Sequence, residues 1–190
     1  LRDVAILSPS RRGPAGVIEL NNTLQSAMGL SDLPKILSRG MAFHERDRVM
    51  QTRNNYSLIY VAEDKTTGAG VFNGEVGIVE KIDGEQRTCQ VRFDDGRSVV
   101  YDGEAIEDLE LAYAMTVHKS QGSEYPAVIL ALAPGPGILY SRNLLYTAMT
   151  RAKKRLFVVG AKSTLERMIA NARPSERRTA LSDLLKSYKK

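Results

Sequence analysis

The stretch that decides the fold is Ala112-Tyr113-Ala114-Met115-Thr116-Val117-His118-Lys119-Ser120-Gln121-Gly122-Ser123-Glu124-Tyr125. It begins apolar and turns abruptly polar, and the apolar run 126–132 that follows has the length of a buried strand. A polar segment between two buried strands is expected at the rim of a sheet, where open α/β sheets bind ligands at the carboxyl ends of their strands. Most polar loops are only solvated, so this segment is a candidate ligand site and not yet an assigned one.

The segments on either side alternate between strand and helix patterns. Buried strands are predicted at 4–7 and 155–160, and a further strand at 48–53. Helical faces are predicted for Val17, Leu20, Leu24 and Met28, for Leu144, Leu145, Ala148 and Met149, for the helix opened by Ser163 and Glu166 as a capping box, and for Leu181, Leu184, Leu185 and Tyr188. Alternating strands and helices indicate an α/β fold with a parallel sheet flanked by helices.

A different pattern interrupts this alternation. Between 73 and 107 apolar residues recur at every second position, and Asp94-Asp95-Gly96-Arg97 is a strong hairpin signal. The sequence therefore predicts a small antiparallel β-barrel at 73–107, inserted into an α/β domain made of 1–72 and 108–190. Residues 57–72 are predicted as a loop, because the run 63–70 within them has no core-forming side chains.

Composition sets further bounds. The 190 residues include 27 Lys+Arg and 22 Asp+Glu, and this net charge of +5 permits a polyanionic partner without requiring one. Aromatic content of 6% without Trp limits base stacking. The single cysteine, Cys89, excludes an internal disulfide and is expected in the core. No signal peptide or long apolar run is visible, so we expect a cytoplasmic location without a membrane partner, and the absence of an initial Met suggests a piece of a longer protein.

Four segments resemble one family. Residues 116–124 resemble motif V of superfamily 1 helicases, with the RecD-like branch as the best match, and 146–153 resemble motif VI. Residues 8–14 followed by Leu20-Asn21 resemble motif IV of RecD-like proteins, and 47–56 with 71–77 resemble the segments that lead into their inserted barrel. Over residues 1–170 the chain is thus similar to the C-terminal, second RecA-like domain of a RecD-like superfamily 1B DNA helicase (exodeoxyribonuclease V alpha-subunit family). The resemblance implies a barrel of the Src-homology-three type.

The motif VI resemblance gives Arg151 the role of an arginine finger on the γ-phosphate of ATP. A planar, permanently charged guanidinium suits that task, because phosphoryl transfer spreads charge over several oxygens. The alternative is a cation that only stabilises the end of a helix. The motif IV resemblance implies that Arg11 or Arg12 also approaches the γ-phosphate. It leaves open which one does, and both could be ordinary surface arginines.

The motif V resemblance implies contacts to single-stranded DNA. Its candidate residues are Thr116, His118, Lys119, Ser120 and Gln121, which offer short donors or charge to the sugar-phosphate backbone. Two further candidates, Asn54 and Asn55, could instead form a turn. Glu124 is expected to accept from a sugar hydroxyl or to have a structural role. With His118 and His44 as the only histidines, no metal site is expected.

The implied function is that of the C-terminal motor domain of an ATP-dependent 5′-to-3′ DNA helicase. Neither a G-x-x-x-x-G-K-[ST] motif nor a strand ending in Asp-Glu occurs in the sequence. ATP and Mg²⁺ should therefore be bound mainly by an N-terminal RecA-like domain of the same chain, and the fragment alone should not hydrolyse ATP. Expected partners are that domain, single-stranded DNA and other repair or nuclease-complex proteins. The alternative functions are a non-catalytic nucleic-acid-binding module and a protein-docking module of a DNA repair protein.

Overall fold

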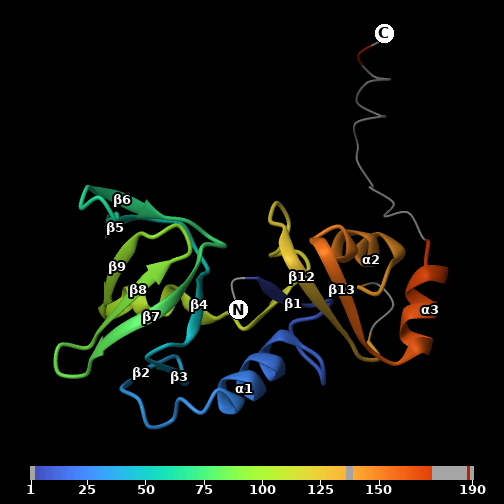
Figure 1. Cartoon of the computed structure of the whole chain (residues 1–190), viewed down its shortest axis with the longest axis horizontal. Helices are drawn as coiled ribbons and strands as arrows, with labels where there is room; N and C mark the ends of the chain where they lie inside the picture. Colours follow the sequence, from blue (N-terminus) through green and yellow to red (C-terminus); the bar gives the residue numbers. More distant parts are fainter. Residues whose placement is uncertain (1–2, 136–138, 173–187, 189–190) are drawn as a thin grey trace.

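The structure is a computed structural model that describes residues 3–135, 139–172 and 188. Its first layer is a four-stranded sheet in the order β11-β1-β12-β13, shown at the right of Figure 1. The strands are β1 (Val4–Ser8), β11 (Ala114–Thr116), β12 (Tyr125–Leu132) and β13 (Ala152–Gly160). All three neighbouring pairs are parallel, so the predicted parallel sheet and its strand at 4–7 are confirmed.

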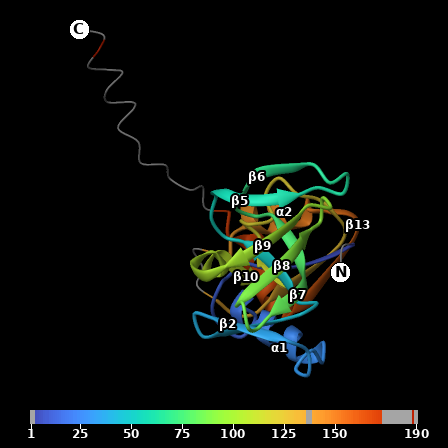
Figure 2. The same cartoon turned by 90° about the vertical axis from the view of Figure 1, so that its left-hand side faces the viewer.

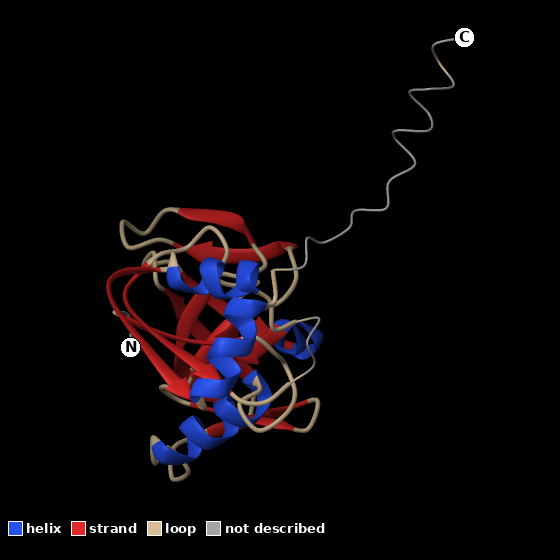
Figure 3. Ribbon diagram, turned by 90° about the vertical axis from the view of Figure 1, so that its right-hand side faces the viewer, coloured by secondary structure: helices blue, strands red, loops and turns tan. Residues whose placement is uncertain are grey.

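Three helices accompany this sheet: α1 (Val17–Ala27), α2 (Arg142–Met149) and α3 (Lys162–Ala170). Helices α2 and α3 cover one face, as Figures 1 and 3 show, and their buried residues Leu145 and Met168 share a core with Leu130 of β12. Ser141 caps α2 by accepting a hydrogen bond from the backbone N–H of Leu144 at 3.2 Å. The predicted capping box of α3 is wrong, because α3 begins at Lys162 and Ser163 already lies within its first turn, without a side-chain cap.

Strand β13 is less buried than its apolar sequence predicts. Phe157 is 52% exposed and Val159 is 59% exposed, so the expectation of a buried strand is wrong there. Strand β13 is the edge of the sheet, and Phe157 is aligned with Ile129 on the face opposite α2 and α3. Parallel sheets are normally covered on both faces. Within the described ranges, Phe157 and Val159 on this second face remain exposed.

The second layer is a seven-stranded antiparallel sheet in the order β10-β4-β7-β8-β9-β5-β6, which faces the viewer in Figure 2. It contains β4 (Arg48–Gln51), β5 (Asn55–Val61), β6 (Thr67–Val71), β7 (Val76–Asp83), β8 (Thr88–Phe93), β9 (Ser98–Asp102) and β10 (Leu109–Leu111). The 3₁₀ helix η1 (Gly103–Asp108) precedes β10, and a separate hairpin joins β2 (Lys35–Ser38) to β3 (Met41–His44). The sheet is therefore wider than the segment 73–107.

The stretch 57–72 forms most of β5 and all of β6, so its prediction as a loop is wrong. Only the polar tip at 62–66 turns, closed by a hydrogen bond from the Ala62 N–H to the Thr66 carbonyl at 2.9 Å. Gly68 lies directly beneath the ring of Tyr60, where a Cβ would collide with the aromatic carbons. Glycine, which usually weakens a strand, allows the end of the Tyr60 ring to lie this close.

Cys89 is fully buried in the core of the antiparallel sheet, as predicted. Burial raises the pKa of its thiol from the ordinary 9.0 to about 12. We therefore expect no reaction with a thiol reagent at pH 8 until the chain is unfolded. Because the folded pKa is raised, this thiol stabilises the fold fully below pH 9.0 and progressively less as the pH rises toward about 12. Denaturant titrations between pH 8 and 11 would measure that loss, and a constant free energy of unfolding would contradict it.

The last predicted helix, from Leu181 onward, lies outside the described residues.

Candidate interface for nucleotide and nucleic acid

Residues 117–124 connect one end of the parallel sheet to the other. Strand β11 runs parallel to β1, and its last residue Thr116 is aligned with Ser8 at the carboxyl ends of both strands. Strand β12 is parallel to β1 as well, and its first residue Tyr125 lies at the amino end of the sheet. The connection must therefore span the height of the sheet. Figure 1 shows part of it as the loop above the start of β12.

Hydrogen bonds hold the loop to β1 and also form within the loop. Val117 donates its N–H to the Ser8 carbonyl at 3.0 Å, and Ser120 donates to the Thr116 carbonyl at 3.2 Å. Gly122 has a φ of +86°, in the left-handed region that glycine adopts without strain. Residues 117–124 therefore form an ordered, hydrogen-bonded connection.

The predicted DNA-facing side chains of this loop differ in exposure. His118 and Gln121 are exposed, and Thr116 and Lys119 are half-buried. Ser120 is fully buried, and its hydroxyl donates to the Val117 carbonyl at 2.8 Å. The expectation that Ser120 contacts DNA does not fit this geometry, because its only hydroxyl hydrogen is already used inside the loop.

Arg151 lies at the amino end of the sheet, between α2 and β13, and is bonded to the same loop. Its Nη1 donates to the Ser123 carbonyl at 2.9 Å, and its own carbonyl accepts from the Tyr125 N–H at 2.8 Å. Its Nε donates to the Thr147 carbonyl at 3.2 Å, and its Nη2 bonds to the Thr150 hydroxyl at 3.2 Å. All of these partners are neutral, and no carboxylate among the described residues is paired with it. The guanidinium is half-exposed, so a ligand can reach it.

Arg11 and Arg12 follow the carboxyl end of β1, so the structure does not bring them together with Arg151. A five-residue strand such as β1 spans roughly 15 Å. Arg11 forms an ion pair with Glu110 at 2.7 Å, whereas Arg12 is exposed and makes no ion pair within the described part of the chain. The two ends of the sheet thus favour separate roles for Arg151 and for Arg11 and Arg12, and their shared approach to one γ-phosphate stays a prediction.

A cavity of about 140 Å³ lies beside Arg11. Its walls come from α1, β3, β4, β10 and β11, and they are mostly apolar, with Met41, Met50 and Met115 among them. The charged groups Arg11, Glu110 and Lys119 also line it. Lys119 Nζ lies 3.5 Å from the second carboxylate oxygen of Glu110.

Glu124, at the far end of the loop, pairs with Lys153 at 3.5 Å, and both side chains are more than half exposed. The pair leaves the carboxylate open to solvent. A structural partner predicted for Glu124 is therefore present, and room for a hydroxyl donor remains.

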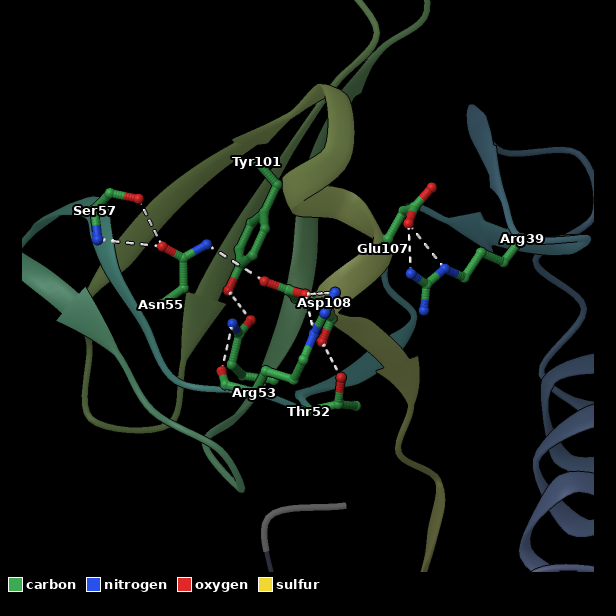
Figure 4. A network of polar contacts seen from close by, with 9 residues as sticks. Arg39, Thr52, Arg53, Asn55, Ser57, Tyr101, Glu107 and Asp108 are labelled. Carbon is green, nitrogen blue, oxygen red and sulfur yellow. Dashed lines mark hydrogen bonds and ion pairs between the residues drawn. The ribbon is translucent and has the colours of Figure 1, made fainter.

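Asn54 and Asn55 belong to the antiparallel sheet and serve its turns. The side-chain oxygen of Asn54 accepts from the Asn73 N–H at 2.9 Å. That of Asn55 accepts from the N–H of Ser57 at 3.2 Å and from its hydroxyl at 2.7 Å, as Figure 4 shows. Asn55 also donates to Asp108 at 3.3 Å, which in turn accepts from Arg53 Nε at 2.7 Å. These bonds match the turn-forming role that the sequence left open.

Two buried polar residues have structural roles that the sequence analysis did not predict. Asn21 of α1 donates to the carbonyls of Leu111 and Ala114 at 2.8 and 3.2 Å and accepts from the Ala114 N–H at 2.8 Å, which fixes the start of β11. Asp47 accepts from the Tyr113 hydroxyl at 2.6 Å. That bond and, first of all, burial raise the pKa of Tyr113. Polar residues inside otherwise apolar or mixed segments were the only sequence signal.

Two family models match segments of this chain, one in each sheet. Residues 111–159 match the UvrD-like helicase C-terminal domain, and residues 20–93 match the SH3 domain of ATP-dependent RecD-like DNA helicases. The ATP-dependent RecD2 DNA helicase of Deinococcus radiodurans is 36% identical over 186 residues, which are 97% of this chain and 24% of the relative. The chain belongs to the RecD-like helicase family. A second RecD-like relative, the RecBCD enzyme subunit RecD of Mycolicibacterium smegmatis, is 32% identical over 170 residues, 86% of this chain and 26% of that protein.

The RecD-like chain thus spans about a quarter of the length of these relatives. Solved Pif1 helicase structures share its fold. One, of two coordinating Pif1 helicases at forked double-stranded DNA, has a TM-score of 0.60 at 18% identity and covers 100% of this chain and 45% of that one. Another, Pif1 from Bacteroides with ADP-AlF3 and single-stranded DNA, has a TM-score of 0.57 at 19% identity, covering 99% and 46%. The predicted RecA-like fold with an SH3-type insertion is confirmed.

Over the described ranges the structure holds no group of three His, Cys, Asp or Glu side chains arranged for a metal ion. In the same part of the chain no helix is long and apolar enough to span a membrane.

Proposed function

We propose that this chain is the second motor domain of an ATP-dependent 5′-to-3′ DNA helicase, and that residues 117–124 connect its nucleotide contact to its DNA contact. The observation that carries the proposal is the hydrogen bond from Arg151 to the Ser123 carbonyl at 2.9 Å. It joins the candidate arginine finger directly to the loop whose other end carries Thr116, His118 and Lys119.

The nucleotide side of the proposal rests on Arg151. ATP, with Mg²⁺, would be held mainly by another RecA-like domain of the full-length protein, and its hydrolysis supplies the free energy. From this side Arg151 would present Nη1 and Nη2 to the γ-phosphate. A bond from the guanidinium to an anionic phosphate oxygen is stronger than its bond to a neutral carbonyl oxygen, so Arg151 would exchange Ser123 for the phosphate. The SH3-type insertion would remain outside this contact.

The DNA side lies at the carboxyl ends of β1 and β11. Thr116, His118 and Lys119 leave β11 there, and Gln121 follows on the exposed surface. Because Arg11 and Arg12 follow β1 at the same end, we assign them to the DNA backbone and not to ATP. Side chains of this kind hold phosphate and sugar without reading sequence. Single-stranded DNA is the proposed substrate. The cytoplasm is the proposed location, and a repair or nuclease complex is a further proposed partner.

Coupling follows from the position of the loop between these two contacts. Releasing Ser123 from Arg151 would free the amino end of the sheet from one constraint on residues 117–124. The loop would then shift at Thr116 and Lys119, where it contacts DNA. Rebinding of Ser123 after phosphate release would restore it. Each ATP cycle would thus move the DNA-binding end once.

Lys119→Ala tests the DNA side. We expect the affinity of the full-length protein for single-stranded DNA to fall by roughly threefold to tenfold, and the slope of log affinity against log salt to decrease by about 0.7, because one phosphate contact is lost. Fluorescence anisotropy with a labelled oligonucleotide at several salt concentrations measures both. Lys162→Ala is the matched control, since Lys162 is 88% exposed on α3 and its ion pair in the described part of the chain is with Glu166. Equal effects of the two substitutions would remove Lys119 from the DNA site.

A further inference from the structure

Glu110 forms ion pairs with two cations at the DNA-binding end, Arg11 after β1 and Lys119 after β11. It lies in β10, the strand that brings the chain back from the antiparallel sheet toward β11. Its Oε1 is 2.7 Å from Arg11 Nη2, and its Oε2 is 3.5 Å from Lys119 Nζ. Arg11 is distant in sequence from the other two residues, and Glu110 and Lys119 lie on either side of β11. The fold brings the three charges together.

The chemistry of this cluster matches that of a bound phosphate. A carboxylate offers two anionic oxygens to the donors of arginine and lysine, as a DNA phosphate would. While Glu110 occupies both cations, the cluster carries one net positive charge instead of two. The Glu110 side chain is 29% exposed and that of Arg11 60% exposed, so a phosphate can reach the cluster from solvent.

The ion pairs are weak enough to be exchanged. Pairs at solvent-exposed positions contribute little to stability, because water screens them and both side chains lose freedom. The Glu110–Lys119 distance of 3.5 Å is also long for a charge-assisted hydrogen bond. A carboxylate fixed in β10 can therefore yield its cations to DNA and take them back.

We propose that Glu110 is a positioning residue that competes with DNA phosphates for Arg11 and Lys119 and so limits how tightly this end of the domain holds the strand. The proposal rests on the proposed function, because it requires both cations to contact DNA. A translocating motor must loosen its grip at every step. A built-in competitor lowers the affinity and provides a partner for the cations whenever the strand moves.

Glu110→Gln tests the proposal, since glutamine keeps the shape and removes the charge. We expect the full-length protein to bind a labelled single-stranded oligonucleotide roughly threefold more tightly, because an exposed ion pair no longer has to be broken. We also expect a steeper salt dependence, by about 0.7 for each cation released to a phosphate. Glu110→Ala is a second variant with the same expected direction, and thermal melting of both verifies that they fold.

Glu107→Gln is the matched control. It removes the same charge from a carboxylate that also pairs with an arginine, Arg39 at 2.5 Å, on the antiparallel side of the molecule (Figure 4). Its DNA affinity should equal that of the wild type. In a protein that already carries Arg11→Ala and Lys119→Ala, the gain from Glu110→Gln should disappear.

Three results would overturn the inference: unchanged or weaker binding by Glu110→Gln, an equal gain from Glu107→Gln, or a gain that persists without the two cations. Failure of the proposed function has a different signature, because the wild-type protein itself would then show no salt-dependent binding of single-stranded DNA.

Discussion

Replacing Arg151 with alanine in the full-length protein is expected to lower DNA-stimulated ATP turnover by about 10³-fold or more, the typical loss when an arginine finger is removed. Binding of single-stranded DNA should stay within about twofold, because Arg151 lies at the amino end of the sheet and the proposed DNA contacts lie at the carboxyl end. A steady-state ATPase assay with and without DNA, together with anisotropy, measures both quantities. Arg151→Lys should recover little, since lysine keeps the charge and loses the planar fork.

Arg142→Ala is the matched control for this experiment. Arg142 begins the same helix α2, and its Nε donates to a backbone carbonyl, that of Ile169, at 2.8 Å. It is exposed and lies at the opposite end of α2 from Arg151. We expect its substitution to leave turnover unchanged. Full ATPase activity in Arg151→Ala would favour the alternative of a non-catalytic binding or docking module.

Asp47→Ala is expected to cause the largest loss of stability. Asp47 is fully buried and accepts three hydrogen bonds: from Tyr113 Oη at 2.6 Å, from Gln25 Nε2 at 2.5 Å and from the His44 N–H at 2.7 Å. Alanine removes the acceptor of the Tyr113 hydroxyl and of the His44 N–H, while Gln25 Nε2 keeps its bond to the Ala42 carbonyl at 2.9 Å. Leaving a buried donor unsatisfied costs about 1–3 kcal/mol, so the total loss should be about 3 kcal/mol or more. For a chain of this size the melting temperature should fall by roughly 10 °C or more.

Thermal unfolding followed by circular dichroism measures that change. Asp32→Ala serves as the control, because Asp32 is exposed in the turn between α1 and β2 and should shift the melting temperature by no more than about 1–2 °C. A similarly small shift for Asp47→Ala would show that the three donors find other partners. The position of Asp47 would then not be what holds α1 and Tyr113 in place.

Sequence reasoning was most successful where one physical pattern dominated. The apolar runs of β1 and β12 could only be buried strands, and the alternation in β7, β8 and β9 required an antiparallel sheet. It failed where composition and tertiary contact disagree. The glycine-rich β6 has the composition of a loop, yet it pairs with β5, where Gly68 is aligned with Tyr60 and lies against the end of its ring. The apolar β13 has the composition of a buried strand, yet its position at the sheet edge leaves Phe157 exposed.

The candidate site shows the same limit. Motif resemblance identified Arg151 and the segment 116–124, and their hydrogen-bonded contact makes them neighbours in space. No local pattern could reveal that Ser120 turns inward, because its burial depends on how the loop crosses the sheet. That Arg11 and Arg12 lie at the other end of the sheet from Arg151 does follow from the predicted parallel strands, since the first two follow a strand and Arg151 precedes one. The ion pairs of Glu110 could not be predicted from sequence either. Glu110 lies in the antiparallel sheet and Arg11 follows a strand of the parallel sheet, so their contact depends on how the two sheets are arranged.

The most direct test of the account is a crystal structure of the full-length protein with single-stranded DNA and an ADP–aluminium fluoride complex. We predict that Arg151 Nη1 lies about 3 Å from the fluoride that replaces the γ-phosphate. We also predict that its bond to the Ser123 carbonyl, 2.9 Å here, is broken. Arg151 still bonded to Ser123, with the nucleotide beyond its reach, would contradict the account.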